Sequence, residues 1–164
     1  MTAYRSFLLL ILLVSSAASA GETILRQPRP GLYTAGQPSA QQLRDAATSG
    51  VTTVIDLRQP DEDRGFDEAA LAEQLGLRYV RLPIAGASGI TDDNARALQR
   101  LLKQDDGKTL LHCASGNRAG ALLSLINARL EGAPLDAALQ LGRDAGMTSL
   151  EPAARAALEN HPTP

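Results

Sequence analysis

The segment His112-Cys113-Ala114-Ser115-Gly116-Asn117-Arg118 combines residue types that could perform nucleophilic chemistry on an oxyanion. An apolar run precedes Cys113, which is the only cysteine of the chain, and a helical pattern follows it, so the thiol is predicted to lie between a buried strand and a helix. Loop amides and the N-terminus of that helix favour both a thiolate and a bound oxyanion. Arg118 adds a planar set of donors that suits a tetrahedral anion. The segment therefore indicates a cysteine nucleophile in an anion-binding loop.

The first 20 residues have the features of a secretory signal peptide. Arg5 supplies a short basic region, residues 7–14 are an unbroken apolar run, and Ala18-Ser19-Ala20 is an A-x-A cleavage pattern. The apolar run is too short to span a bilayer. We therefore expect a signal peptide at 1–20 and a single domain at 21–164, secreted across the inner membrane to the periplasm, with no membrane span after cleavage.

Composition narrows the possible partners and sharpens the interpretation of the cysteine. Without Arg5, 15 of the 16 basic residues remain against 18 acidic ones, and the basic residues are dispersed, so nucleic acid is not an expected partner. In an oxidising compartment cysteines usually pair, but Cys113 has no partner in the chain. The alternative is an inert core thiol, which would need neither a glycine-bearing loop nor an arginine. Because no metal-ligand motif is present, we expect no metal and no cofactor.

Strands and helices are expected to alternate along the chain. Residues 61–64 are mostly acidic and are expected to form a solvated loop. The alternation predicts an α/β fold, with a central, mainly parallel sheet of about four to five strands flanked by helices. Ligands of such sheets bind beyond the carboxyl ends of the strands, which is where Cys113 is expected. Strands are predicted at 31–36, 51–57, 78–84 and 109–112, and helices at 40–48, 68–75, 92–103, 119–130, 135–145 and 150–160.

Four segments occur in an informative order: 36–39 (Gly-Gln-Pro-Ser), 53–58 (Thr-Val-Ile-Asp-Leu-Arg), 76–84, and the cysteine segment 112–118. Together they resemble the beta-lactamase-hydrolase-like phosphatase-like family, a bacterial branch of the dual-specificity and tyrosine phosphatase superfamily, over roughly residues 30–150. The resemblance implies a cysteine phosphatase-like fold and a metal-free, two-step mechanism. Cys113 would attack phosphorus and become a cysteinyl-phosphate, while His112 would orient the loop and favour the thiolate. The groups implied to bind the phosphoryl oxygens are the Arg118 side chain and the backbone amides of Ala114, Ser115, Gly116, Asn117 and Arg118.

The chain departs from the superfamily pattern in three ways. Four residues separate Cys113 from Arg118 instead of five, a spacing that resembles the six-residue loop of rhodanese-type sulfurtransferases. Ala119 stands where these phosphatases commonly have Ser or Thr. Residues 85–90, which correspond to the loop of the general-acid aspartate, contain no carboxylate. Asp92 and Asp93 are the nearest candidates for that acid, although acidic residues behind a threonine cap also complement the helix dipole.

Three functions therefore stay open. The first is an exported cysteine-dependent phosphatase that hydrolyses phosphomonoesters, acting on a phosphorylated small molecule or protein. The second is a rhodanese-like sulfurtransferase that carries a persulfide on Cys113. The third is a non-catalytic pseudophosphatase that binds anions. The extended resemblance favours the first and the loop length favours the second. The sequence defines neither the physiological substrate nor the oligomeric state.

Overall fold

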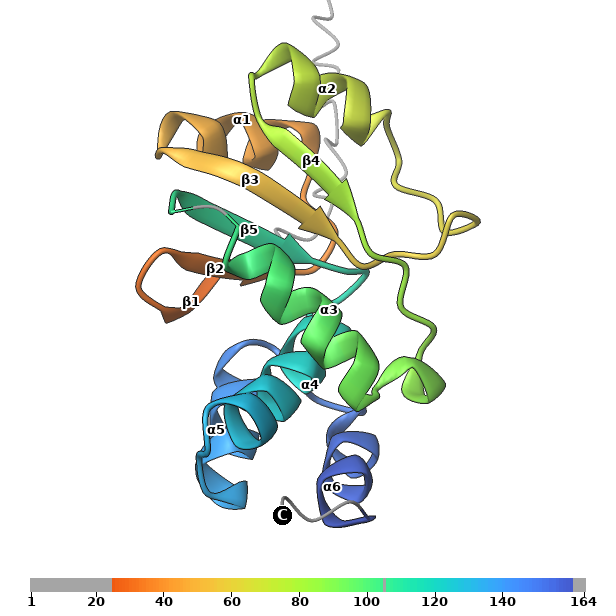
Figure 1. Cartoon of the computed structure of the whole chain (residues 1–164). Coiled ribbons are helices and arrows are strands. Elements are labelled where there is room, and N and C mark those ends of the chain that lie inside the picture. The colour runs from red at the N-terminus through yellow and green to blue at the C-terminus, as the bar shows by residue number, and fades with distance from the viewer. Residues whose placement is uncertain (1–24, 105, 161–164) are drawn as a thin grey trace, which may run out of the picture.

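A mixed five-stranded sheet forms the centre of the protein (Figure 1). The computed structural model describes residues 25–104 and 106–160, so the predicted signal peptide lies outside the described residues. The strand order is β1-β2-β5-β3-β4, in which β2, β5, β3 and β4 are parallel and β1 is antiparallel to β2. This confirms the predicted α/β fold with a mainly parallel sheet. The strands are β1 (Arg26–Arg29), β2 (Leu32–Ala35), β3 (Val51–Asp56), β4 (Arg78–Arg81) and β5 (Lys108–His112).

Helices cover both faces of the sheet (Figure 1). The two faces have separate apolar clusters, and neighbouring residues of β5 contribute to both. Leu110 packs with the cluster under α1 and α2, whereas Leu111 packs with the cluster of the other helices, as expected from the alternation of side chains along a strand. The helices are α1 (Ala40–Thr48), α2 (Glu68–Gln74), α3 (Asp92–Leu102), α4 (Asn117–Leu125), α5 (Leu135–Asp144) and α6 (Glu151–Asn160), with short turns η1 (Ala87–Gly89) and η2 (Ile126–Leu130).

The predicted elements differ from the observed ones mainly at their ends. Strand β4 ends at Arg81, three residues before the predicted end. The amides of Leu82 and Ile84 still donate to the carbonyls of Asp56 and Leu57 at 2.9 and 3.0 Å, but because these two carbonyls are consecutive, the regular alternation of the ladder is lost after Arg81. Helix α4 begins at Asn117, and its predicted continuation winds into the π-helical turn η2. Strand β1 is not among the predicted strands, because its sequence Arg-Gln-Pro-Arg has no apolar alternation.

Because β5 is the central strand of the sheet, the cysteine segment that follows it lies at the middle of one sheet edge. His112, the last residue of β5, pairs in register with Ala35 of β2 on one side and Asp56 of β3 on the other. The parallel arrangement therefore brings the carboxyl ends of three strands together next to Cys113. Helix α4 starts immediately afterwards and is buried from Arg118 to Leu125. Among the residues that the structure describes, no helix is long and apolar enough to cross a membrane.

Candidate active site

The segment 113–118, here called the cysteine loop, curls around the Cys113 sulfur. Gly116 has a φ of 86°, a left-handed conformation that glycine adopts without strain. This turn directs the Gly116 amide to the sulfur, with 3.2 Å between N and Sγ. Cys113 itself is fully buried, whereas Ala114 and Ser115 are exposed. The loop therefore has a closed end around the sulfur and an open rim.

Backbone and side-chain contacts brace the cysteine loop on two sides. On the β2 side, the Gln37 amide donates to the Ala114 carbonyl at 3.1 Å. On the other side, Asn117 Oδ1 accepts hydrogen bonds from the amides of Thr148 and Leu150 at 2.9 and 3.1 Å. The side chain of Asn117, for which the sequence predicted only a backbone contact to substrate, thus ties the loop to the segment between α5 and α6.

Glu62 fixes the Arg118 guanidinium in a bidentate ion pair. Arg118 Nη1 lies 2.6 Å from Glu62 Oε1, and Nη2 lies 2.7 Å from Oε2. Nη1 also donates to the Ile84 carbonyl at 3.0 Å. The Glu62 hydrogen bond, opposed by burial and supported by the nearby Cys113, raises the pKa of Arg118. The guanidinium therefore remains charged and is held in one orientation.

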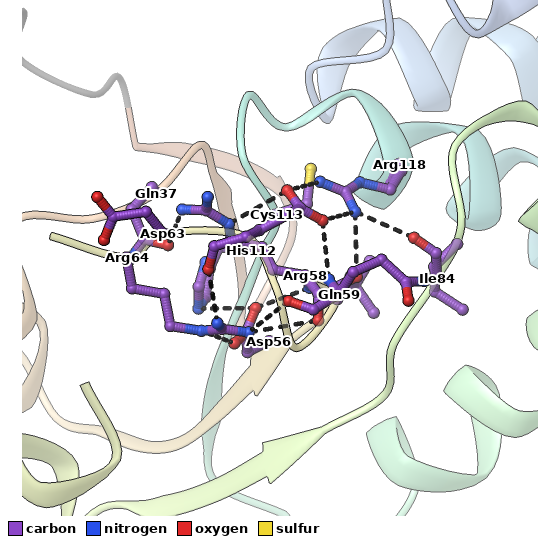
Figure 2. Close-up of polar contacts among 12 residues, drawn as sticks. Gln37, Asp56, Arg58, Gln59, Asp63, Arg64, Ile84, His112, Cys113 and Arg118 are labelled. Carbon is purple, nitrogen blue, oxygen red and sulfur yellow. Dashed lines mark hydrogen bonds and ion pairs between the residues drawn. The ribbon is translucent and has the colours of Figure 1, made fainter. Parts of the chain in front are cut away.

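This pairing determines which donors of Arg118 can meet a substrate. A guanidinium offers five N–H donors in a rigid arrangement. Glu62 and the Ile84 carbonyl take the donors on the edge formed by Nη1 and Nη2. The edge formed by Nε and the second proton of Nη2 has no carboxylate or carbonyl partner in the described part of the chain, and Figure 2 shows the Cys113 sulfur beside the guanidinium. An oxyanion above the sulfur can therefore bind to this second edge.

Glu62 is ionised at neutral pH. The Arg118 hydrogen bond outweighs the opposing effect of burial and, with help from the Gln59 amide, lowers the pKa of Glu62 from 4.5 to about 2. In this arrangement Glu62 holds no proton to donate. The expectation that residues 61–64 form a solvated loop is wrong for Glu62 and Arg64, whose side chains point inward to Arg118 and Asp56. A run of charged residues in a sequence does not show whether its side chains face solvent or the protein interior, since the burial of Glu62 and Arg64 arises from tertiary contacts.

A buried polar cluster supports His112 from behind. His112 Nε2 lies 3.0 Å from Glu68 Oε1 of α2, and both side chains are fully buried. Asp56 Oδ2 accepts from Arg64 Nε at 2.7 Å and from the Tyr79 hydroxyl at 2.8 Å. Burial alone would raise the pKa of Asp56, but His112 and these hydrogen bonds together lower it.

The composition of this cluster also resembles a metal site. Ligand-type atoms of Asp56, Glu68 and His112 lie within 4.8 Å of one another. However, Arg64 and Tyr79 already satisfy one oxygen of Asp56, and the Arg58 amide donates to the other at 2.8 Å. The observed partners therefore favour a structural role behind the cysteine loop. Sequence analysis missed Glu68 because it lies in a helix 44 positions away from His112.

The two predicted general-acid candidates lie in the first turn of α3. Asp92 Oδ1 is 3.5 Å from Arg129 Nε, and Asp93 accepts from Arg96 at 2.8 Å with 91% of its side chain exposed. Thr91 caps the helix as predicted. Neither aspartate lines the cavity that adjoins the cysteine loop. Their observed contacts are those of helix-end residues.

Comparisons with known proteins identify the family. A family model described as "DSP-PTPase phosphatase fused to NAD+ Kinase" matches residues 12–150. The chain therefore belongs to this family of dual-specificity and tyrosine-type phosphatases, which confirms the resemblance seen in the sequence.

Curated relatives match over part of their length. A beta-lactamase hydrolase-like protein of Xylella fastidiosa is 35% identical over 98 residues, which cover 57% of this chain and 22% of the relative. Human dual specificity protein phosphatase 26 is 35% identical over 101 residues, covering 58% of this chain and 46% of that protein. The chain thus spans about a fifth to a half of the length of these relatives.

Solved structures share the fold. A protein from Neisseria meningitidis described as a putative phosphatase superimposes with a TM-score of 0.70 at 22% identity, covering 83% of this chain and 97% of that one. Pseudomonas aeruginosa TpbA gives a TM-score of 0.67 at 24% identity, with 84% of each chain covered. A second TpbA structure is described as a complex with pTyr. The cysteine phosphatase-like fold predicted from the sequence is confirmed.

Proposed function

We propose that this protein is an exported, cysteine-dependent phosphatase that hydrolyses phosphomonoesters through a cysteinyl-phosphate intermediate. The observation that carries the proposal is the arrangement around one sulfur. The Gly116 amide donates to Cys113 Sγ at 3.2 Å, and Glu62 orients the Arg118 guanidinium beside it. Membership of a phosphatase family supports phosphorus as the centre that this sulfur attacks.

The proposed reaction has two steps. In the first, the Cys113 thiolate attacks phosphorus, an S–P bond forms, and the ester P–O bond breaks as the leaving group takes its electron pair. In the second, water attacks phosphorus, the S–P bond breaks, and inorganic phosphate and the thiolate are released. Backbone amides 114–118 and the open edge of Arg118 stabilise the charge on the three equatorial oxygens. His112 acts as a positioning residue, held by Glu68.

The chemistry of the leaving group follows from the surrounding carboxylates. Residues 85–90 have no carboxylate, Glu62 is ionised, and Asp92 and Asp93 are engaged by arginines. A positioned general acid contributes typically about 10²–10⁴ in rate. We therefore propose that the favoured substrates have leaving groups that depart without a proton, such as aryl phosphates including phosphotyrosine.

A sulfurtransferase is the second candidate, because four residues separate Cys113 from Arg118. To separate the candidates, purified protein is assayed with para-nitrophenyl phosphate and, in parallel, with thiosulfate plus cyanide. Phosphate release that falls by about 10³-fold in Cys113→Ser supports the phosphatase. Thiocyanate formation without phosphate release would identify the protein as a sulfurtransferase instead. Phosphate or vanadate binding without either reaction would identify a pseudophosphatase.

We also propose that residues 1–20 direct export to the periplasm. The proposal rests on the basic, apolar and A-x-A pattern of this segment. Fractionation of expressing cells should place the protein in the periplasmic fraction with Gly21 as its first residue. An intact N-terminus in the cytoplasmic fraction would contradict it.

A further inference from the structure

We propose that Arg26 forms a second anion-binding subsite next to the cysteine loop, so that the preferred ligand carries another anionic group close to its phosphoryl group. This inference rests on the proposed function, because it assigns the first anion to the cysteine loop. The second anion is a carboxylate or a phosphate, which share the chemistry that a guanidinium recognises.

The subsite is a cavity of about 240 Å³ that the cysteine loop itself helps to line. Its lining includes Ala114, Ser115 and Gly116 of the cysteine loop together with Gly36 and Ala145, and among the residues that the structure describes Arg26 is the only charged one that lines it. Exposed Ala114 and Ser115 belong to the open rim of the cysteine loop. A ligand whose phosphoryl group is bound by the loop amides would therefore have this cavity directly beside it.

The antiparallel pairing of β1 explains why an arginine near the start of the domain reaches this edge. Arg26 pairs with Thr34, one residue before the end of β2. Because β2 is parallel to β5, its end lies at the same edge of the sheet as Cys113. A parallel first strand would have placed its first residue at the opposite edge.

Two glycines, Gly116 and Gly146, let Arg26 lie close to the cysteine loop. A methyl group added to Gly146 would lie 3.5 Å from Arg26 Nε and 3.5 Å from Gly116 Cα. The guanidinium and the loop glycine therefore flank the same position. Gly146 has a φ of 107°, where other residues are strained. The close approach of Gly146 to Gly116 therefore holds the Arg26 guanidinium next to the cysteine loop.

The Arg26 charge is available for such a ligand. Arg26 is exposed, and its side chain makes no hydrogen bond or ion pair with residues 25–104 or 106–160. Its neighbour on the same strand, Arg29, is instead paired with Glu131 at 2.8 Å. Within residues 25–104 and 106–160, no carboxylate lines the cavity. An incoming anion would therefore meet a positive charge beside the loop that no described carboxylate neutralises.

Phosphonates test the subsite without turnover. Calorimetry on the intact protein measures dissociation constants for methylphosphonate, phosphonoacetate and methylenediphosphonate, which carry no second anion, a carboxylate and a second phosphonate respectively. The selectivity is the affinity for a two-anion probe divided by that for methylphosphonate. Arg26→Gln should lower it about three- to tenfold, and Arg26→Lys should lower it less. The control is Arg44→Gln, which removes the same charge from an exposed helix position outside the cavity.

Each outcome decides the proposal. A lower selectivity of Arg26→Gln for both two-anion probes supports the proposal. A lower selectivity for only one of these probes also supports it and identifies the second anion as a carboxylate or a phosphate. Equal selectivity in Arg26→Gln and the unmodified protein overturns it, as does an equal drop in Arg44→Gln. If methylphosphonate binds but the selectivity for the two-anion probes shows no dependence on Arg26, only the subsite fails. If methylphosphonate does not bind at all, the proposed anion-binding loop fails and the subsite fails with it.

Discussion

Replacing Glu62 with glutamine tests the electrostatic core of the site. The substitution keeps the shape of the side chain but removes the charge that binds Arg118 at 2.6 and 2.7 Å. The pKa of Glu62 falls from 4.5 to about 2 on folding, and a difference of this size is worth about 3 kcal/mol at neutral pH. Since the amide oxygen still accepts one hydrogen bond, we expect Glu62→Gln to lower the free energy of unfolding by about 2–3 kcal/mol at pH 7.

The pH dependence of this loss has a defined sign. A carboxylate whose pKa is lower in the folded state stabilises the protein fully above its unfolded pKa, and this contribution disappears as the pH falls through the folded value. The difference between Glu62→Gln and the unmodified protein should therefore shrink between pH 4.5 and about 2. Urea denaturation at several pH values measures it, and Asp61→Asn is the control because Asp61 is an exposed neighbour in the same loop.

The same variant separates two roles for Glu62. If Glu62 orients Arg118 so that its other edge meets the substrate, phosphate should bind the variant about tenfold more weakly. Tighter phosphate binding in Glu62→Gln would mean that Glu62 competes with the substrate. A stability difference below about 0.5 kcal/mol, or one that does not change with pH, would refute the electrostatic reasoning.

Three further substitutions test other contacts. Arg118→Lys should weaken phosphate binding by about 10- to 100-fold in calorimetry, because one ammonium cannot keep Glu62 on one edge and an oxyanion on the other; unchanged affinity would remove Arg118 from the site. Tyr79→Phe, which deletes the 2.8 Å hydrogen bond to buried Asp56, should cost about 1–3 kcal/mol in urea denaturation, and a neutral result would show that Asp56 needs no hydroxyl. In Gly120→Ala the new methyl group would lie 2.3 Å from the Gly142 carbonyl oxygen. The free energy of unfolding should therefore fall by at least about 1–3 kcal/mol, which a lower melting temperature would show. An unchanged melting temperature would mean that α4 and α5 can move apart without cost.

Local patterns predicted the elements that position Cys113. The apolar residues before it and Gly116 after it define a buried strand followed by a turn, and the structure has both. The starts of α1 and α3 also depend on local signals, because the Ser39 and Thr91 side chains accept from the amides of Gln42 and Asn94, three residues further on. Such signals need no knowledge of the rest of the fold.

Long-range partners were beyond the reach of the sequence. Glu62 and Glu68 are ordinary acidic residues in their segments, and only the packing of their segments against the end of β5 buries them near Arg118 and His112. Strand β1 also depends on a tertiary contact. Its polar side chains do not indicate a strand, and its antiparallel pairing with β2 makes it one. The roles of the predicted site residues themselves stay predictions until the variants are measured.

The contacts of Asn117 have a consequence for biosynthesis. Its side chain holds the amides of Thr148 and Leu150, more than thirty residues later in the chain. During translation, a polypeptide that has emerged only as far as α5 lacks these donors, and its cysteine loop is incompletely tethered. A nascent chain consequently holds Cys113 before it holds both partners of the Asn117 side chain, and the cysteine loop is fully tethered only after residues 148–150 have emerged.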